Sequence, residues 1–265
     1  MQYFERLATL PSLAELRSRA AAYARQFRLD RAIRTARSNA SGVLPDTTIT
    51  EICDLWGDGS LTASDGYVRT LLVEAQKAHG HVLQCGADLT TLFLALQLER
   101  RGVRLWTVEN NAHAANTLRT WLAQYELTQA HIIAAPADLT ADGVGYAIDA
   151  ARLPSPLTLV VCDASNAHPG SARRLLPRIK DKLPPNAVTL VRNVRRRSDF
   201  DFLAEWCRDN EASFVVKGKV DPFAKIVLRD RAAAESHQAA RINTAFATQT
   251  NGVRSMRLAT PKRSA

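Results

Sequence analysis

The chain has few cysteines, and they are not clustered. Its four cysteines are Cys53, Cys85, Cys162 and Cys207, and no two of them form a CxxC pair. A structural zinc site needs clustered ligands, so this spacing argues against one. Cys85 and Cys162 end apolar runs, where a free cysteine behaves as a small hydrophobic residue. We therefore expect a reducing, cytoplasmic setting for the protein.

Long apolar runs are absent as well. No run among the 265 residues reaches the roughly 18 residues that a membrane-spanning helix needs. The first ten residues, MQYFERLATL, lack the charged-then-apolar pattern of a signal peptide. We therefore expect no membrane span. Hydrophobic residues still make up 46% of the chain, which is enough to build a buried core.

Acidic residues are outnumbered by basic ones, and the formal net charge is +9. The basic residues gather in one N-terminal segment, in one later cluster and in the tail, namely Arg17, Arg19, Arg25, Arg28, Arg31, Arg34 and Arg37, then Arg192, Arg195, Arg196 and Arg197, then the residues after Arg229. No regular interleaving of aromatic residues accompanies these clusters, so base-stacking surfaces are not indicated. Nucleic-acid binding stays an alternative that the pattern does not favour, and we interpret the clusters as solvated helix faces and a basic tail.

The most informative stretch is VLQCGADLTTL at residues 82–92. An apolar run stops at Gly86, a polar turn follows, and Thr90 opens a second apolar run at helical spacing. This pattern predicts a strand, a tight turn and a helix. Such a turn places helix amides and strand-end side chains around a ligand at the carboxyl edge of a parallel sheet. The candidate ligand-binding residues here are Gln84, Gly86, Ala87, Asp88, Thr90 and Thr91.

The next predicted strand, residues 103–108, ends in an acid. This acid, Glu109, stands 23 residues beyond Gly86. An acid at that place typically binds the hydroxyl pair of a ribose. Glu109 and the following Asn110 are therefore further candidate ligand-binding residues. The order of strand, glycine turn, helix, strand and acid predicts the nucleoside-binding half of an α/β fold.

The turn also discriminates between nucleosides. A dinucleotide fingerprint, G-x-G-x-x-G, needs glycine at three places, which here hold Gly86, Asp88 and Thr91. A carboxylate at Asp88 would repel a pyrophosphate. S-adenosylmethionine (SAM) carries no phosphate but has an ammonium and a sulfonium group, which a nearby carboxylate favours. The local chemistry thus favours SAM over NAD.

These residues resemble the first motif of class I SAM-dependent methyltransferases, usually written acid-C-G-S-G-x-S-T. Residues 56–72, WGDGSLTASDGYVRTLL, and residues 159–166, LVVCDASN, are similar to a bacterial group close to the O-methyltransferases. The resemblance covers roughly residues 50 to 230. The chain departs from the motif at Gln84, where the acid would stand, at Asp88, where the second glycine would stand, and at Thr90-Thr91, in place of Ser-Thr.

This resemblance implies a doubly wound α/β fold of Rossmann-like methyltransferase type. The sheet would be mostly parallel, with seven strands and a closing antiparallel strand, and SAM would be the cofactor. We divide the chain into an N-terminal helical extension with its linker (1–48), a methyltransferase-like domain (49–230) and a basic, mobile tail (231–265). Residues 12–37 are predicted to be helical, with an apolar side made of Leu13, Leu16, Tyr23, Phe27 and Ile33.

Two further segments are cofactor candidates because of their place in this family. The segment before the first strand often lies over the cofactor, which makes Trp56, Ser64 and Asp65 candidates. In the alternative interpretation, Trp56 only packs against other residues of the protein, and Ser64 or Asp65 caps a helix over residues 66–77. After the third strand, predicted at 132–135, an adenine normally lies near residues 135–138. Ala137 and Asp138 are candidates there, and Asp138 either accepts the adenine amino group or caps a helix.

The predicted acceptor side lies at the ends of the fourth and fifth strands, at 157–162 and 187–191. Related metal-dependent enzymes hold a divalent cation with an acid after strand four and an Asp-Asn pair after strand five. Here the matching places hold Asp163, Arg192 and Asn193. A guanidinium cannot ligate a cation, so we expect an ion pair between Asp163 and Arg192 and no metal.

The remaining connections are an irregular segment at 139–156 and a closing hairpin of strands at 214–217 and 223–228.

The candidate catalytic residues are Asp163 and His168. His168 follows strand four, and its unperturbed pKa near 6.5 suits proton transfer, although a loop histidine can equally be a surface residue. We predict a SAM-dependent methyltransferase that acts on a hydroxyl of a small molecule or a sugar without a metal. The alternative is a catalytically inactive protein of the same fold that serves as a binding or scaffold partner. Homo-oligomerisation stays open.

Overall fold

The structure is a computed structural model, and it describes residues 12–39, 43–56, 64–140, 143–162 and 171–229. Its centre is a seven-stranded sheet with the strand order β3-β2-β1-β6-β7-β9-β8. The strands are β1 (His81–Cys85), β2 (Leu105–Glu109), β3 (Ala130–Ala134), β6 (Leu157–Cys162), β7 (Val188–Arg192), β8 (Ala212–Lys217) and β9 (Phe223–Leu228).

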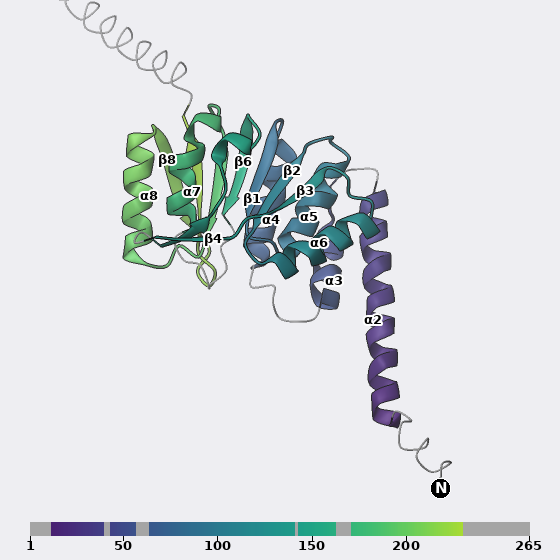
Figure 1. Cartoon of the computed structure of the whole chain (residues 1–265). Coiled ribbons are helices and arrows are strands. Elements are labelled where there is room, and N and C mark those ends of the chain that lie inside the picture. The colour runs from purple at the N-terminus through teal and green to yellow at the C-terminus, as the bar shows by residue number, and fades with distance from the viewer. Residues whose placement is uncertain (1–11, 40–42, 57–63, 141–142, 163–170, 230–265) are drawn as a thin grey trace, which may run out of the picture.

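The pairing of the strands confirms the predicted fold class. β1 pairs in parallel with β2 and with β6, and β2–β3 and β6–β7 are parallel too. β9 runs antiparallel to both of its neighbours, β7 and β8, and is the predicted reversed closing strand. The central strands are buried on both faces, as the continuous apolar run of β6 predicts. All carboxyl ends of the parallel strands therefore meet at one edge of the sheet, which lies at the bottom in Figure 1.

Helices cover both faces of the sheet. One face packs against α4 (Asp65–Lys77), α5 (Leu89–Glu99) and α6 (Ala112–Gln124), and the other packs against α7 (Ser171–Ile179) and α8 (Arg197–Asp209). Two hydrophobic clusters, one for each face, form the core. Figure 1 shows α7 and α8 at the β8 end of the sheet, with α4, α5 and α6 toward the β3 end.

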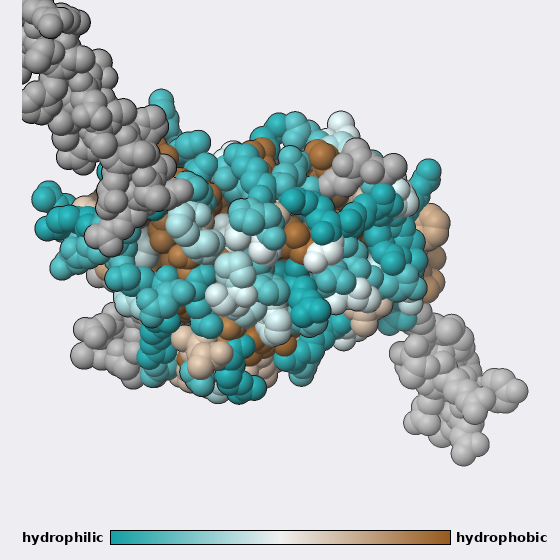
Figure 2. Space-filling view, turned by 90° about the horizontal axis from the view of Figure 1, so that it is seen from above, coloured by the Kyte–Doolittle hydropathy of each residue, from teal (hydrophilic) through white to brown (hydrophobic). Residues whose placement is uncertain are grey.

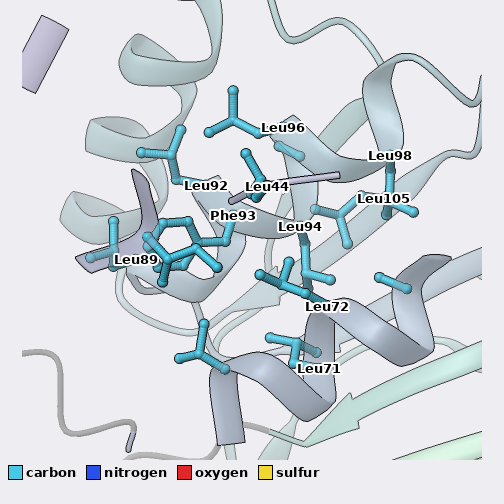
Figure 3. Packing of buried hydrophobic residues seen from close by; sticks show 14 of the residues in the cluster. Leu44, Leu71, Leu72, Leu89, Leu92, Phe93, Leu94, Leu96, Leu98 and Leu105 are labelled. Carbon is cyan, nitrogen blue, oxygen red and sulfur yellow. The ribbon is translucent and has the colours of Figure 1, made fainter. Parts of the chain in front are cut away.

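The helix α5 is buried on all sides because further helices cover its outer surface. Every residue from Leu89 to Leu98 is buried. The outer layer consists of α3 (Asp46–Trp56) and the C-terminal part of α2 (Leu13–Ser38), whose apolar residues join the same cluster. Figure 3 shows Leu44 and Leu72 packed around the leucines of α5. The buried Gln97 accepts a hydrogen bond of 3.2 Å from the backbone N–H of Leu44, so the segment before α3 is fixed to α5.

Two elements were not predicted from the sequence. One is α3, which occupies Asp46–Trp56, where Ile49, Ile52 and Leu55 recur at helical spacing and are buried. The connection expected to be irregular contains a hairpin of β4 (Ala137–Thr140) and β5 (Gly143–Tyr146), which packs on α7. Its strands are too short for a clear alternation of apolar residues, so the sequence carried little signal for them.

The expected apolar side of α2 was wrong for four of its five residues. Leu13, Leu16, Tyr23 and Phe27 are exposed, and only Ile33 is buried. The face that packs on the body consists of Leu29, Ala32, Ile33 and Ala36. In Figure 1 the N-terminal half of α2 extends away from the body, past the carboxyl edge of the sheet. One helix thus carries two apolar faces, one in each half, which a single stripe cannot describe.

The edge of the sheet where the parallel strands begin has a mostly hydrophilic surface. Figure 2 looks from above onto the edge at the amino ends of the parallel strands, and hydrophobic residues show there only in small separate patches among hydrophilic ones. None of the described helices is both long enough and apolar enough to cross a bilayer.

Candidate functional site

The glycine turn after β1 forms as predicted. Gly86 has φ +93°, in the left-handed region that glycine adopts without steric cost. Its backbone N–H donates to the carbonyl of Val108 at 2.9 Å, so the turn closes onto the end of β2. Gly86, Ala87 and Asp88 are all half-exposed. The turn therefore presents backbone and the Asp88 side chain to solvent at the carboxyl edge of the sheet.

Asp88 is the N-cap of α5. Its Oδ1 accepts the backbone N–H of Thr90 at 2.7 Å and also the Thr90 hydroxyl. In return, the Asp88 N–H donates to Thr91 Oγ1 at 3.2 Å, which completes a capping box. The chain's own carboxylate thus occupies the helix N-terminus where a bound phosphate would otherwise lie.

Beneath the turn, Gln84 joins the strand to the helix. It is fully buried, and its Nε2 donates to Thr90 Oγ1 at 2.7 Å. Its Oε1 accepts from Thr107 on β2 at 3.4 Å. Gln84 is therefore not presented to a ligand, and its contribution to the site is to hold the turn on the sheet.

Glu109 lies beside the turn at the end of β2. The residue is 7% exposed, and each carboxylate oxygen accepts one backbone N–H, from Ala87 at 2.7 Å and from Asn111 at 2.7 Å. A carboxylate has about four acceptor positions, so each oxygen retains one for a ligand hydroxyl. Asn110, between Glu109 and the α6 cap Asn111, is half-exposed. The structure therefore brings Glu109 and Asn110 to the same turn as Ala87 and Asp88.

Arg192, at the end of β7, connects three parts of this edge. Its side chain is only 2% exposed; its Nε lies 3.3 Å from Asp221 Oδ2, and its Nη1 lies 3.9 Å from Asp88 Oδ2. The guanidinium carbon lies 5.4 Å from the ring centre of Tyr67 on α4, a cation–π distance. Asp221 Oδ2 also accepts the backbone N–H of Ser64 at 3.0 Å. One buried cation thus holds together the starts of α4 and α5 and the turn before β9.

The sequence missed Asp221 as a member of this edge. It precedes β9 in a turn, and only the antiparallel pairing of β9 with β7 brings it beside Arg192. The position expected to be the partner of Arg192, Asp163, lies outside the described residues, as does His168. No group of three potential metal ligands occurs among the residues that the structure describes.

The other candidates have local roles in the structure. Ser64 is the N-cap of α4, with its hydroxyl 3.4 Å from the Tyr67 N–H. Trp56 packs against Trp121, with ring centres 4.3 Å apart. Asp138 lies within strand β4, so the alternative that it caps a helix was wrong; its Oδ2 is 3.5 Å from Arg178 Nη2 on α7. Ala137 begins the same strand and is exposed.

The fold is shared with solved methyltransferase structures. The SAH-bound Podospora anserina methyltransferase PaMTH1 is 16% identical, with a TM-score of 0.52 over 83% of this chain and 98% of that one. An O-methyltransferase from Bacillus cereus in complex with SAH is 16% identical, with a TM-score of 0.50 over 70% of this chain and 92% of that one. No family model and no curated protein sequence matches the chain. At these identities the likeness establishes the Rossmann-like methyltransferase fold.

Proposed function

We propose that the protein transfers a methyl group from SAM to a hydroxyl of a small molecule or a sugar, without a metal. The observation that carries the choice of cofactor is the N-terminus of α5. Asp88 already satisfies the first amides of this helix, and its negative charge opposes a pyrophosphate. A ligand that bears an ammonium in place of phosphates fits this turn, and SAM is such a ligand. The two solved structures of the same fold that contain SAH support the same cofactor.

Glu109 supports a nucleoside at this edge for a second reason. Its carboxylate is fixed by two backbone N–H groups and retains further acceptor positions. In the proposal, Glu109 accepts the ribose hydroxyls, and the backbone of Gly86 and Ala87 lines the cofactor. Ser64, Asn110, Ala137 and Asp138 complete the proposed surroundings of the cofactor. Thr90 and Thr91 are fully buried, so they support the turn from beneath, as Gln84 does.

The metal-free part of the proposal rests on Arg192. A buried guanidinium stands at the strand-five position where related metal-dependent enzymes carry a carboxylate ligand, and it is already paired with Asp88 and Asp221. A permanent positive charge there repels a divalent cation. When bound, SAM supplies an activated methyl group, so the protein need only orient the acceptor and accept its proton. Asp163 and His168 are the residues proposed for that proton transfer.

The test is conversion of SAM to SAH, followed by mass spectrometry, with a panel of phenols, sugars and other small hydroxyl compounds. The proposal predicts acceptor-dependent conversion that persists in EDTA and is not increased by magnesium. Activity that disappears with EDTA and returns with magnesium would contradict the metal-free mechanism. Tight SAH binding without conversion of any acceptor would favour the inactive, binding-only alternative.

A further inference from the structure

The first half of α2 has no buried residue. Every residue from Ser12 to Arg28 is exposed, and burial begins only at Leu29. At 1.5 Å per residue this half is roughly 24 Å long, and Figure 1 shows it extending away from the body. Most of the stability of a helix in a protein comes from the packing of one face. A helical segment of this length without packing therefore points to a partner.

An apolar stripe runs along this exposed half. It consists of Leu13, Leu16, Ala20, Tyr23 and Phe27, which fall within an arc of about 80° at 3.6 residues per turn. Leu13 is 75% exposed, Tyr23 77% and Phe27 71%. The stripe faces away from the body, because the packed residues of the second half lie roughly 170° around the helix. Single exposed apolar residues are ordinary, but a contiguous group of them marks an interaction site.

Arginines border the apolar stripe on both sides. Arg17 and Arg19 lie about 80° to either side of its centre, and Arg28 lies about 100° around, on the same side as Arg17. Further along the helix, Arg31 and Arg34 lie on the line that the stripe would follow. All five side chains belong to exposed residues. The outward side of α2 is therefore apolar in its first half, basic at both borders and basic beyond.

Few acids lie close enough to neutralise these arginines. The one acid among residues 12–28, Glu15, lies about 120° from the centre of the stripe, and its carboxylate accepts the backbone N–H of Ser12 at 2.6 Å. Arg28 lines a groove with Glu51 and Asp54 of α3, so the body offsets part of its charge.

The remaining arginines of the exposed half keep their charge. None of the ion pairs in the described part of the chain involves Arg17, Arg19 or Arg25. Arg25 lies nearly opposite the stripe, about 160° from its centre. The free half of α2 thus combines an apolar stripe with a positive charge that its own body does not balance, which is a match for an anionic partner.

We propose that α2 binds the surface of an anionic lipid bilayer, with the apolar stripe immersed at the level of the headgroups and the helix in the plane of the surface. Side chains 80–100° from the centre of an immersed stripe lie at the height of the lipid phosphates. Arg17 and Arg19 occupy that place on the two borders, and long guanidinium side chains there donate to phosphate and carboxylate oxygens. This contact goes beyond the proposed methyl transfer and does not depend on it.

Charge and shape select a lipid surface over two other partners. Pairing the stripes of two copies of the chain would bring Arg17 and Arg19 of both to the borders of one contact, where like charges are destabilising. A nucleic acid matches the arginines, but its phosphates would lie against Leu13 and Leu16 in the stripe. An anionic bilayer offers negative headgroups above an apolar interior, and its flat surface reaches both borders of the stripe at once.

The first test is co-sedimentation of the full chain with vesicles of equimolar phosphatidylcholine and phosphatidylserine. The wild type should bind these vesicles at least about tenfold more tightly than vesicles of phosphatidylcholine alone, because each basic residue near an anionic surface adds favourable free energy. A rise in ionic strength should weaken the binding, because salt screens the surface charge. A wild type that binds neither kind of vesicle, or both equally, would overturn the proposal.

The stripe is tested by a pair of substitutions with a matched control. Leu16→Gln with Tyr23→Gln should weaken binding to the mixed vesicles by at least about tenfold. Ala14→Gln with Ala22→Gln changes the other side of the same helix and should bind as the wild type does. Binding that persists in the Leu16→Gln, Tyr23→Gln variant, or that the control loses equally, would assign the vesicles to another part of the chain and overturn the proposal.

The borders are tested separately. Arg17→Gln with Arg19→Gln should weaken binding to the mixed vesicles by about 10- to 30-fold and leave the weak binding to phosphatidylcholine unchanged. Far-UV circular dichroism without vesicles should show equal helix content in this variant and the wild type. Wild-type affinity in the folded variant would contradict the role of the two arginines.

A fluorescent label reports whether the stripe enters the bilayer. In a Cys53→Ser background, which removes the one cysteine that is not buried, an environment-sensitive dye is attached at Phe27→Cys or, as the control, at Ala22→Cys. Mixed vesicles should shift the emission to the blue at the first position and not at the second. An equal response at both positions would overturn the proposed orientation. A dimer without vesicles in light scattering, dissociated by Leu16→Gln with Tyr23→Gln, would assign the stripe to a second copy instead.

Discussion

At the scale of single residues, the carboxyl edge of the sheet depends on one buried cation. Arg192 is almost fully buried, and the chain offsets the cost of removing its charge from water with the carboxylates of Asp88 and Asp221. Both acids come from turns, one at the start of α5 and one before β9. The position of these turns is therefore linked to the charge of Arg192.

Replacing this cation is expected to be costly. Arg192→Leu leaves Asp88 and Asp221 partly buried without their common partner, so we predict a loss of about 3–5 kcal/mol in the free energy of unfolding. Urea denaturation measures the loss. The matched control is Arg197→Leu, because Arg197 is 93% exposed and its pair with Asp201 is a surface pair; its effect should stay within about 0.5 kcal/mol. Equal effects of the two substitutions would contradict the role of Arg192.

A second buried ion group gives a prediction about pH. Burial disfavours the charged form of Glu74, but hydrogen bonds from Lys225 and Lys77 outweigh this effect and hold the pKa of the Glu74 carboxyl below its usual value. Because the pKa of this carboxyl is lower in the folded state than in the unfolded state, its ionisation stabilises the protein at pH values above the unfolded-state pKa. This stabilisation is lost as the pH falls through the folded-state pKa. The stability difference between wild type and Glu74→Gln should therefore be present at neutral pH and decrease progressively below about pH 4.5. Urea melts at a series of pH values measure it, and a difference independent of pH would contradict the assignment.

At the scale of elements, the glycine turn is the part that the sequence predicts best. Its signals are all local in the sequence: an apolar run, a glycine, a polar residue and a run with helical spacing. The structure forms β1, the turn and α5 at these positions. Glu109 ends β2 as predicted, for the same reason. The contact between Arg192 and Asp221 was not predicted, because the two residues meet only through the pairing of β7 with β9. The β4–β5 hairpin was missed because its four-residue strands show no clear period.

The turn itself can be tested with a pair of glycine substitutions. Gly86→Ala places a side chain at φ +93°, which we expect to cost about 1–2 kcal/mol and to impair binding of SAH at the turn. Gly66→Ala is the matched control, because Gly66 is exposed within α4 and a Cβ there meets no atom within 4 Å. That control should instead stabilise the protein by roughly 0.5–1 kcal/mol. Calorimetric melting gives both values, and a neutral Gly86→Ala would show that the turn tolerates a side chain.

At the scale of the whole molecule, the N-terminal extension and the sheet share one core. The predicted division at residue 48 falls inside α3, and the packed half of α2 belongs to the same hydrophobic cluster as α4 and α5. The sequence suggested one apolar side along α2 because its apolar residues are regularly spaced. Which of them are buried depends on where the helix meets α3 and α5, and local periodicity does not contain that information.

The shared core predicts how the extension contributes to stability. Ile33 is fully buried, so Ile33→Ala should lower the free energy of unfolding by roughly 2–4 kcal/mol, in a single transition. Val73→Ala, which removes a half-exposed side chain from α4, should change it by less than about 0.5 kcal/mol. A separate early transition in Ile33→Ala would mean that the extension unfolds independently of the sheet.

The central claim is that the carboxyl edge of the sheet binds a SAM-type nucleoside through Glu109 and the glycine turn. Isothermal titration calorimetry with SAH, and with NAD for comparison, tests it most directly. We predict that the wild type binds SAH and not NAD. Glu109→Ala should weaken SAH binding by about 10- to 150-fold, corresponding to about 1.5–3 kcal/mol for a hydrogen bond to a charged group, while circular dichroism remains unchanged. Binding of NAD without SAH, or unchanged SAH affinity in a folded Glu109→Ala protein, would contradict the account.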